Sequence, residues 1–219
     1  MKVEKNKKYP YQELRNSLIR LLREKGITDE AVLAVISKIP RHLFFIDTAF
    51  HIHAYKDQAF SIGAGQTISQ PYTVAFQSQL LDIKAGDKIL EVGTGSGYQT
   101  AVLIELGATV YTIERQRELF IRAQQQLHDI GYFPKFFYGD GYEGKVVFAP
   151  YNKIIVTAGA PSIPQALLKQ LAVGGRMVIP VGEKDVQKML IIDRISETKF
   201  TQKDYGSFAF VPLLKGTEK

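Results

Sequence analysis

An apolar run that ends in three closely spaced glycines constrains this chain more than any other feature. Residues 89–92 read Ile-Leu-Glu-Val, residues 93–97 read Gly-Thr-Gly-Ser-Gly, and a helical pattern starts at Tyr98. Because glycine has no Cβ, such a run can turn tightly and lets a flat ligand approach the backbone closely. The pattern predicts a strand, a turn and a helix N-terminus that together hold a nucleotide-like cofactor.

Strand-like and helix-like segments alternate from Pro71 onward, a residue that suits the first turn of a helix. The expected strands are Lys88–Val92, Thr109–Ile113, Lys135–Tyr138, Lys153–Thr157 and Arg176–Pro180. The expected helices that alternate with them are Tyr98–Leu106, Gln116–Ile130 and Pro164–Leu171. This alternation predicts an α/β protein with a mainly parallel sheet and helices on its faces.

The C-terminal part of the chain breaks the alternation. Residues 188–195 and 208–214 are both strand-like, and no helical pattern lies between them. They predict an antiparallel hairpin at one edge of the sheet, where Pro212 suits a strand end.

Two amphipathic helices precede the sheet and predict a helical cover. The first ends at Gly26, and the second is expected to be capped by Thr28 and closed by Pro40. Residues 41–70 hold no regular period, and loops of that length usually carry function. We therefore expect a single domain over residues 1–219, in which residues 1–81 form the cover and substrate loop and residues 82–219 form the cofactor-binding core.

Composition and charge exclude several classes of protein. The 219 residues include no cysteine, so disulfides and thiolate metal sites are excluded. The apolar runs are shorter than the roughly 18 residues of a membrane span, and no signal peptide is visible at the start. These features predict a cytoplasmic protein with no membrane association. The histidines are not spaced as metal ligands, so no metal is assigned to His42, His51, His53 or His128.

The net charge of +6 favours anionic partners, either nucleic acid or carboxylate-bearing substrates, through long-range attraction. The basic residues are scattered, however, and the densest group is best explained as a solvated N-terminal arm, formed by Lys2, Lys5, Lys7 and Lys8. The sequence therefore predicts no nucleic-acid partner.

Carboxylates at two strand ends indicate the type of cofactor. Glu114 follows the second strand and lies 114 − 95 = 19 residues after Gly95, close to the spacing of an acidic ribose ligand. Its alternative role is an exposed carboxylate in the first turn of the next helix. Asp140 follows the third strand and is expected to accept from an adenine amino group, the alternative being an ordinary turn at Asp140-Gly141.

The spacing of the glycines argues against a dinucleotide. A pyrophosphate site would have the pattern G-x-G-x-x-G, whereas here the third glycine comes one residue early and Tyr98 stands where glycine or alanine is wanted. A cofactor with adenosine but without phosphate fits better, and S-adenosylmethionine is such a molecule.

The run Gly-Gln-Thr-Ile-Ser-Gln-Pro-Tyr at 65–72 closely resembles the signature loop of protein-L-isoaspartate O-methyltransferases. The likeness covers residues 14–214, and its further blocks, in the right order, are residues 39–44, 90–101, 154–161 and 174–182. The resemblance implies a three-layer Rossmann-like S-adenosylmethionine-dependent methyltransferase fold. It also implies methyl esterification of the free α-carboxylate of L-isoaspartyl residues in damaged proteins and peptides, with S-adenosylhomocysteine as the second product.

The resemblance also assigns roles to particular residues. Ser69 is the expected catalytic residue, because its hydroxyl can donate to the substrate carboxylate, although serine before a proline-initiated helix is often a cap. The residues expected to bind the cofactor are Glu91, Gly93, Thr94, Gly95, Ser96, Gly97, Glu114, Asp140, Gly141 and Thr157. The residues expected to contact the substrate are Thr67, Ile68, Gln70 and Val211.

Two other classes of function stay open at the level of sequence. A nicotinamide oxidoreductase on a similar sheet would want glycine in place of Tyr98. An RNA methyltransferase or RNA-binding protein would want clustered basic residues among aromatic ones. The carboxyl methyltransferase, expected to be a monomer acting on isoaspartyl proteins and peptides, is the preferred interpretation.

Overall fold

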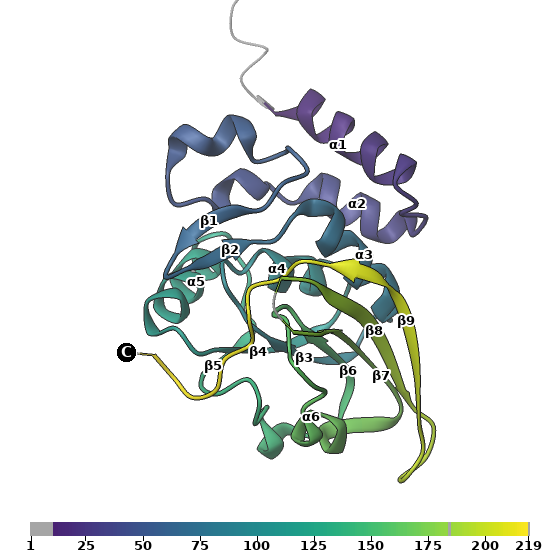
Figure 1. Cartoon of the computed structure of the whole chain (residues 1–219). Helices are drawn as coiled ribbons and strands as arrows, with labels where there is room; N and C mark the ends of the chain where they lie inside the picture. The colour runs from purple at the N-terminus through teal and green to yellow at the C-terminus, as the bar shows by residue number, and fades with distance from the viewer. Residues whose placement is uncertain (1–10, 184, 219) are drawn as a thin grey trace, which may run out of the picture.

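The alternating segments form one seven-stranded sheet within the described residues, 11–183 and 185–218, of the computed structural model (Figure 1). The strand order is β5-β4-β3-β6-β7-β8-β9. The strands are β3 (Lys88–Val92), β4 (Thr109–Glu114), β5 (Lys135–Tyr138), β6 (Tyr151–Val156), β7 (Leu171–Val181), β8 (Gln187–Arg194) and β9 (Phe200–Phe208). The first five in chain order pair in parallel, whereas β8 and β9 pair antiparallel, which confirms the expected fold class.

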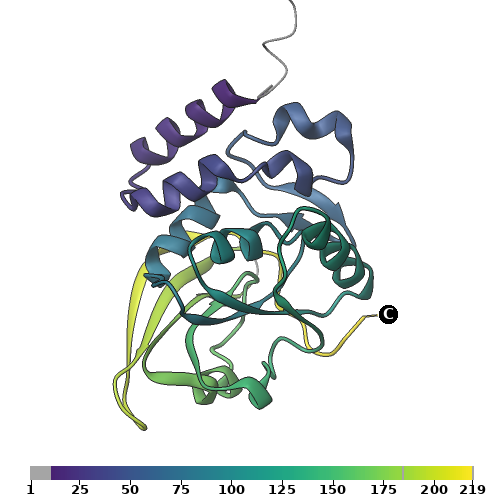
Figure 2. The same cartoon turned by 180° about the vertical axis from the view of Figure 1, so that it is seen from behind.

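Side-chain alternation along β3 shows how the sheet acquires a helical layer on each face. Ile89 packs in one cluster with Leu103 of α4 (Tyr98–Glu105), and Leu90 packs in another with Leu167 of α6 (Gln165–Gln170). Successive side chains of a strand point to opposite faces, so these two clusters lie on opposite sides of the sheet. Helices α3 (Pro71–Leu81) and α5 (Arg117–Asp129) complete the layer of α4, which faces the viewer in Figure 2.

The order of the strands places a ligand crevice between β3 and β6. From β3 the chain proceeds to β4 and β5 on one side, and it then returns to form β6 on the other side of β3. In an open parallel sheet, ligands bind beyond the carboxyl ends of the strands where the order reverses. The glycine turn follows β3 and Thr157 follows β6, so both lie at this crevice.

The expected cover is present at the top of the molecule in Figure 1. It contains α1 (Gln12–Glu24) and α2 (Glu30–Lys38), whose buried apolar residues join those of α4 and α5 in one core cluster. Residues 41–70 are more regular than the sequence predicted. They form two 3-10 helices, η1 (Arg41–Phe44) and η2 (Thr48–His53), and an antiparallel hairpin of β1 (Phe60–Gly63) and β2 (Gln66–Ile68).

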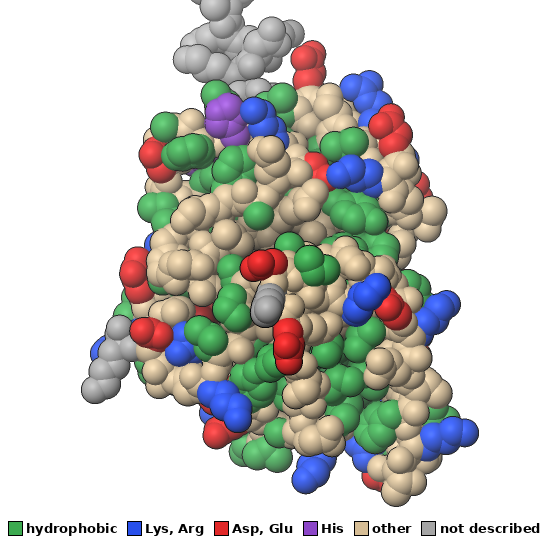
Figure 3. Space-filling view, in the orientation of Figure 1, with side chains coloured by type: hydrophobic (Ala, Val, Ile, Leu, Met, Phe, Trp, Pro, Cys, Tyr) green, Lys and Arg blue, Asp and Glu red, His purple; other side chains and the backbone are tan. Residues whose placement is uncertain are grey.

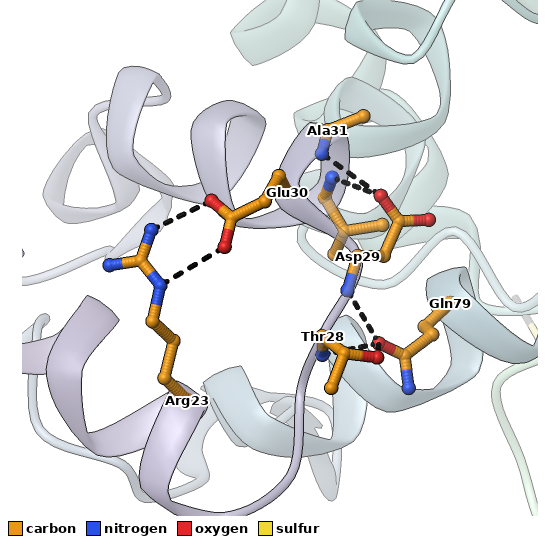
Figure 4. Close-up of polar contacts among 7 residues, drawn as sticks. Arg23, Thr28, Asp29, Glu30, Ala31 and Gln79 are labelled. Carbon is orange, nitrogen blue, oxygen red and sulfur yellow. Dashed lines mark hydrogen bonds and ion pairs between the residues drawn. The ribbon is translucent and has the colours of Figure 1, made fainter.

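The N-terminal cap of α2 differs from the prediction. Asp29, not Thr28, is the cap, because its carboxylate accepts from the amides of Ala31 and Val32 at 2.9 and 3.1 Å (Figure 4). The backbone amide of Thr28 instead donates to Oε1 of Gln79 at 2.7 Å. This contact ties the cover to α3. Asp29 takes the cap position because it directly precedes Glu30, the first residue of α2, so its carboxylate reaches the free amides of the first turn.

The C-terminal edge is antiparallel as predicted, but its last strand lies earlier in the chain than the sequence pattern predicts. The strand expected at residues 208–214 is β9 at Phe200–Phe208, most of whose side chains are exposed. The sequence pattern missed it because an exposed edge strand needs no apolar alternation. The apolar residues 210–214 instead cross the ends of the inner strands, where Pro212 forms a parallel bridge with Gly159. The predicted basic arm, Lys2 to Lys8, lies outside the described residues.

Candidate active site

A pocket opens at the crevice between β3 and β6, and segments far apart in the sequence line it. Ten residues expected to act in the site line this pocket: Thr67, Ser69, Gly93, Thr94, Gly95, Ser96, Glu114, Gly141, Thr157 and Val211. Five others are not among its lining residues: Glu91, Gly97, Asp140, Ile68 and Gln70. The glycine turn and the Ser69 loop therefore meet at a single cavity.

The glycine turn satisfies most of its own amides. The amides of Gly93 and Thr94 donate to the carbonyl of Ile113, and the amide of Gly97 donates to the carbonyl of Thr94. The amide of Gly95 donates to Oε2 of Glu114 at 2.9 Å. A pyrophosphate is normally held by free amides at such a turn. This turn offers few of them and has a carboxylate beside it, so it suits a cofactor without phosphate.

Gly93 is required by the packing between the two strand ends. A Cβ at Gly93 would lie 2.4 Å from Oγ1 of Thr157, and its φ of +98° is one that side chains rarely adopt. The Thr157 hydroxyl donates to the carbonyl of Gly93 at 2.7 Å. Only glycine lets β3 and β6 approach each other this closely at the floor of the pocket.

Glu114 is a buried carboxylate at the end of β4 and only 5% exposed. Besides accepting from Gly95, it accepts from the amide of Gln116 through Oε1 at 2.9 Å. The interpretation of Glu114 as an exposed helix-terminal carboxylate is therefore wrong. An ionised carboxylate has about four acceptor sites, so two remain for the hydroxyls of a ribose.

Gly97 lies behind the turn and serves packing. Its φ is +82°, and a Cβ there would lie 2.7 Å from Cδ1 of Leu127 in α5. The early third glycine, which argued against a dinucleotide, therefore lets α5 pack closely behind the turn.

We expect Gly97→Ala to destabilise the protein more than Gly131→Ala, with denaturant unfolding as the measurement. Both residues have φ near +85°, at +82° and +87°, but a Cβ at Gly131 meets no atom of the described residues within 4 Å. The left-handed backbone costs about 1 kcal/mol in both variants, and crowding of Leu127 adds about 1–3 kcal/mol for Gly97 alone. Equal losses would contradict the packing role of Gly97.

Glu91 is wholly buried between β3 and α4 rather than at the pocket surface. The Thr100 hydroxyl donates to its Oε2 at 2.5 Å, and Oε1 has no hydrogen-bond partner among the described residues. Burial raises the pKa of Glu91 to about 8, so the side chain is mostly protonated at neutral pH. Its assignment to the cofactor stays a prediction.

This raised pKa predicts a pH-dependent stability. The folded state holds the proton of Glu91 up to about pH 8, whereas the unfolded chain releases it near 4.5. The folded state binds this proton more tightly than the unfolded chain does, so the proton contributes to the free energy of unfolding. That contribution is complete below pH 4.5 and is lost as the pH rises toward 8, at up to about 1.4 kcal/mol per pH unit. We expect Glu91→Gln to remove this slope in unfolding free energies measured from pH 5 to 8. Parallel pH profiles for the two proteins would contradict the assignment.

Asp140 occupies a turn that the C-terminal segment covers. Its Oδ1 accepts from the amide of Tyr142 at 2.8 Å and its Oδ2 from the amide of Gly216 at 2.7 Å. The ordinary turn considered for Asp140 is thus present, and an adenine contact would be made in addition to it. Val211 reaches the pocket through the same segment, because its carbonyl accepts from the amide of Gly159 at 2.8 Å.

Ser69 lies between the hairpin and α3. The cap position of α3 is Gln70 and not Ser69, so the interpretation of Ser69 as a helix cap is wrong. No partner for the Ser69 hydroxyl is found among the residues that the structure describes, while its carbonyl accepts from Nη2 of Arg41 at 3.1 Å. The hydroxyl is therefore available to a ligand in the pocket.

Ile68 and Gln70 flank Ser69 and turn away from the pocket. Ile68 is 1% exposed in the core beneath the hairpin. Gln70 donates through Nε2 to Oδ2 of Asp57 at 2.9 Å, and Asp57 also accepts from the amide of Tyr72. Asp57 and Arg41 therefore hold the Ser69 loop by hydrogen bonds, a role that the sequence pattern did not predict for either residue. The block at residues 39–44 signalled Arg41 only as part of the resemblance.

The fold and the site define a Rossmann-like S-adenosylmethionine-dependent methyltransferase. Three features agree with that class: the order of the strands, a glycine turn suited to a cofactor without phosphate, and the buried Glu114 at the end of the next strand. The chain belongs to the protein-L-isoaspartate(D-aspartate) O-methyltransferase family, whose sequence model matches residues 12–218.

Relatives and solved structures agree with this assignment. A protein-L-isoaspartate O-methyltransferase of Christiangramia forsetii is 60% identical over 208 residues, which cover 94% of this chain and 97% of the relative. That of Pseudomonas syringae pv. tomato is 51% identical with the same coverage. A solved protein-L-isoaspartate O-methyltransferase matches 90% of this chain with a TM-score of 0.82 and 26% identity, and this chain spans 65% of its length.

A second solved structure supports the fold alone. It is described as a putative protein-L-isoaspartate O-methyltransferase of Plasmodium falciparum in complex with S-adenosyl-L-homocysteine. Its TM-score is 0.80 at 24% identity, and the match covers 92% of this chain and 99% of that one.

On the face shown in Figure 3, Lys and Arg side chains are dispersed among acidic and apolar ones. No described helix combines the length and the apolar character needed to span a membrane. Within residues 11–183 and 185–218, no three His, Asp or Glu side chains gather as a set of metal ligands.

Proposed function

We propose that this chain methylates the free α-carboxylate of L-isoaspartyl residues in damaged proteins and peptides, with S-adenosylmethionine as the donor. The observation that carries the proposal is that Ser69 lines the same pocket as the glycine turn. The acceptor loop and the cofactor turn therefore face one cavity. Family membership favours this activity over the nicotinamide oxidoreductase and the RNA methyltransferase.

The residues of the turn fit this cofactor. Glu114 would accept from the ribose hydroxyls, and the cradle at Gly93 and Gly95 would admit the adenosine against bare backbone. Asp140 and Gly141 would lie at the adenine. When bound, S-adenosylmethionine supplies an activated methyl group on a positively charged sulfur.

The chemistry explains why a general base is not required. An α-carboxyl group has a pKa of about 3.5, so the acceptor is already ionised at neutral pH. What the protein must supply is alignment, and good alignment alone can remove a large part of a barrier. Ser69 would donate its hydroxyl hydrogen to one carboxylate oxygen and leave the other directed at the donor. Thr67 and Val211 would line the space around the acceptor.

The product accounts for repair. Methoxide leaves an ester carbonyl far more readily than oxide would leave a carboxylate. The neighbouring backbone amide nitrogen therefore attacks the ester carbonyl, the C–OCH3 bond breaks, and methoxide takes up the amide proton and leaves as methanol, which closes a succinimide. Hydrolysis of that ring without an enzyme yields aspartyl and isoaspartyl linkages, so each cycle repairs a fraction of the molecules.

Chromatography of a single isoaspartyl peptide tests this sequence of steps. Incubation with the protein and S-adenosylmethionine should convert the peptide progressively into its aspartyl isomer with release of methanol. A matched reaction with S-adenosylhomocysteine should leave the peptide unchanged. Failure to form the aspartyl isomer with the methyl donor would contradict the proposal.

The cytoplasmic location and the monomeric state expected from the sequence stay predictions, which cell fractionation and light scattering would check.

A further inference from the structure

Arg41 is a completely buried arginine, which is unusual for a side chain with a permanent charge. It opens η1 in the cover, far from both the glycine turn and the Ser69 loop in the sequence. Burial lowers the pKa of Arg41 to about 10, so the guanidinium stays protonated at neutral pH. A cation in such a place is costly unless its contacts compensate for the lost water.

The contacts of Arg41 join the two halves of the site. Nη2 donates to the carbonyl of Ser69 at 3.1 Å and to the carbonyl of Gln58 at 3.2 Å. The guanidinium carbon lies 5.0 Å from the ring centre of Tyr98, the first residue of the helix that follows the glycine turn. It also lies 5.4 Å from the ring centre of Phe45. One side chain therefore contacts both the acceptor loop and the start of α4.

The buried charge is only partly compensated. Among the residues that the structure describes, Nε and Nη1 of Arg41 have no hydrogen-bond partner. Asp57 contributes a favourable charge interaction, but its own oxygens accept from Lys25, Gln70 and Tyr72. An arginine kept only for stability would be expected to satisfy more of its five donors.

We infer that Arg41 is a positioning residue for methyl transfer, which fixes Ser69 relative to the glycine turn by bridging the Ser69 carbonyl and the Tyr98 ring. The inference rests on the proposed function, because it assigns Arg41 an effect through the Ser69 hydroxyl. A loop held at its carbonyl keeps the neighbouring hydroxyl in place, and misplacement by about 1 Å can cost two orders of magnitude in rate.

A double-mutant cycle on the full chain tests the inference. Arg41→Met should lower kcat for an isoaspartyl peptide by about 10-fold or more, with the Kd for S-adenosylhomocysteine changed by less than about threefold. In a Ser69→Ala background the same substitution should have little further effect on kcat, because there is no hydroxyl left to position. If Arg41 had a purely structural role, the fold-loss in kcat of the double variant would instead be the product of the fold-losses of the two single variants.

Arg15→Met is the matched control. Arg15 lies in the same cover and donates to the Tyr55 hydroxyl through Nε at 3.0 Å and to the carbonyl of Ser37 through Nη1 at 3.5 Å. Among the described residues it has no hydrogen bond to the Ser69 loop. It should leave kcat within about twofold of the unmodified protein. Arg41→Lys is the second variant if Arg41→Met does not fold. It keeps the charge but not the planar fork, so it should also lower kcat, by less.

The outcomes separate this inference from the proposed function. An unchanged kcat in Arg41→Met, or a full multiplication of the two losses, would overturn the role of Arg41 while isoaspartyl methylation stands. If the unmodified protein methylates no isoaspartyl peptide, the proposed function fails. The role of Arg41 is then decided by amide hydrogen exchange at residues 67–70, which Arg41→Met should accelerate and Arg15→Met should not.

Discussion

Replacing Ser69 by alanine should lower kcat for an isoaspartyl peptide by about 100-fold, the effect of removing one preorganised donor from an active site. Ser69 lines the pocket, and its hydroxyl has no hydrogen-bond partner among the described residues, so its removal leaves no unpaired protein group. The Kd for S-adenosylhomocysteine should change by no more than about twofold, because the turn that would hold it does not depend on this hydroxyl. Initial rates and calorimetric titration measure the two quantities.

Ser61→Ala is the control for this experiment. Ser61 lies in β1 of the same hairpin with an exposed side chain and is not among the residues that line the pocket. Its substitution should leave both kcat and the Kd near their original values. Parallel losses of turnover and cofactor affinity in Ser69→Ala would show that the loop has collapsed and would remove the support for a direct role.

The second large effect is expected for Glu114→Gln, which should weaken binding of S-adenosylhomocysteine by roughly 50-fold, since hydrogen bonds to a charged group contribute about 1.5–3 kcal/mol. Glu114 accepts from two backbone amides, at Gly95 and Gln116. A glutamine would present an NH2 group to one of these amides and would offer fewer acceptors to a ribose. Isothermal titration provides the affinity.

Glu118→Gln supplies the comparison, because Glu118 lies in α5 with a side chain 70% exposed and pairs with Arg122 on the same helix. Its substitution should leave the affinity unchanged. If Glu114→Gln binds the cofactor product as tightly as the unmodified protein, the ribose assignment is wrong.

The regular part of the fold could be predicted because each strand and helix carries its own pattern. Lys88–Val92 and Tyr98 onward follow from an apolar run, three glycines and a change of period, and the structure places β3 and α4 there. The edge strand β9 could not be predicted in the same way, because its side chains are mostly exposed and polar. The hairpin at β1 and β2 was missed because strands of four and three residues are too short to show a period.

The site likewise contains residues that could be predicted from local patterns and residues that could not. Glu114 could be placed by its spacing from Gly95, since both lie at the ends of adjacent parallel strands. The role of Arg41 could not be predicted, because it depends on tertiary contacts with Ser69 and Tyr98 that no local pattern encodes. The burial of Glu91 and the packing role of Gly97 likewise depend on α4 and α5 as neighbours.

The central claim is tested most directly by a pair of peptides that differ only in the linkage of one aspartyl residue. With S-adenosylmethionine labelled in its methyl group, the protein should transfer label to the isoaspartyl peptide and leave the aspartyl peptide essentially unlabelled. The label should be released as methanol in mild base, as expected of a methyl ester. Equal labelling of the two peptides, or labelling of neither, would contradict the account.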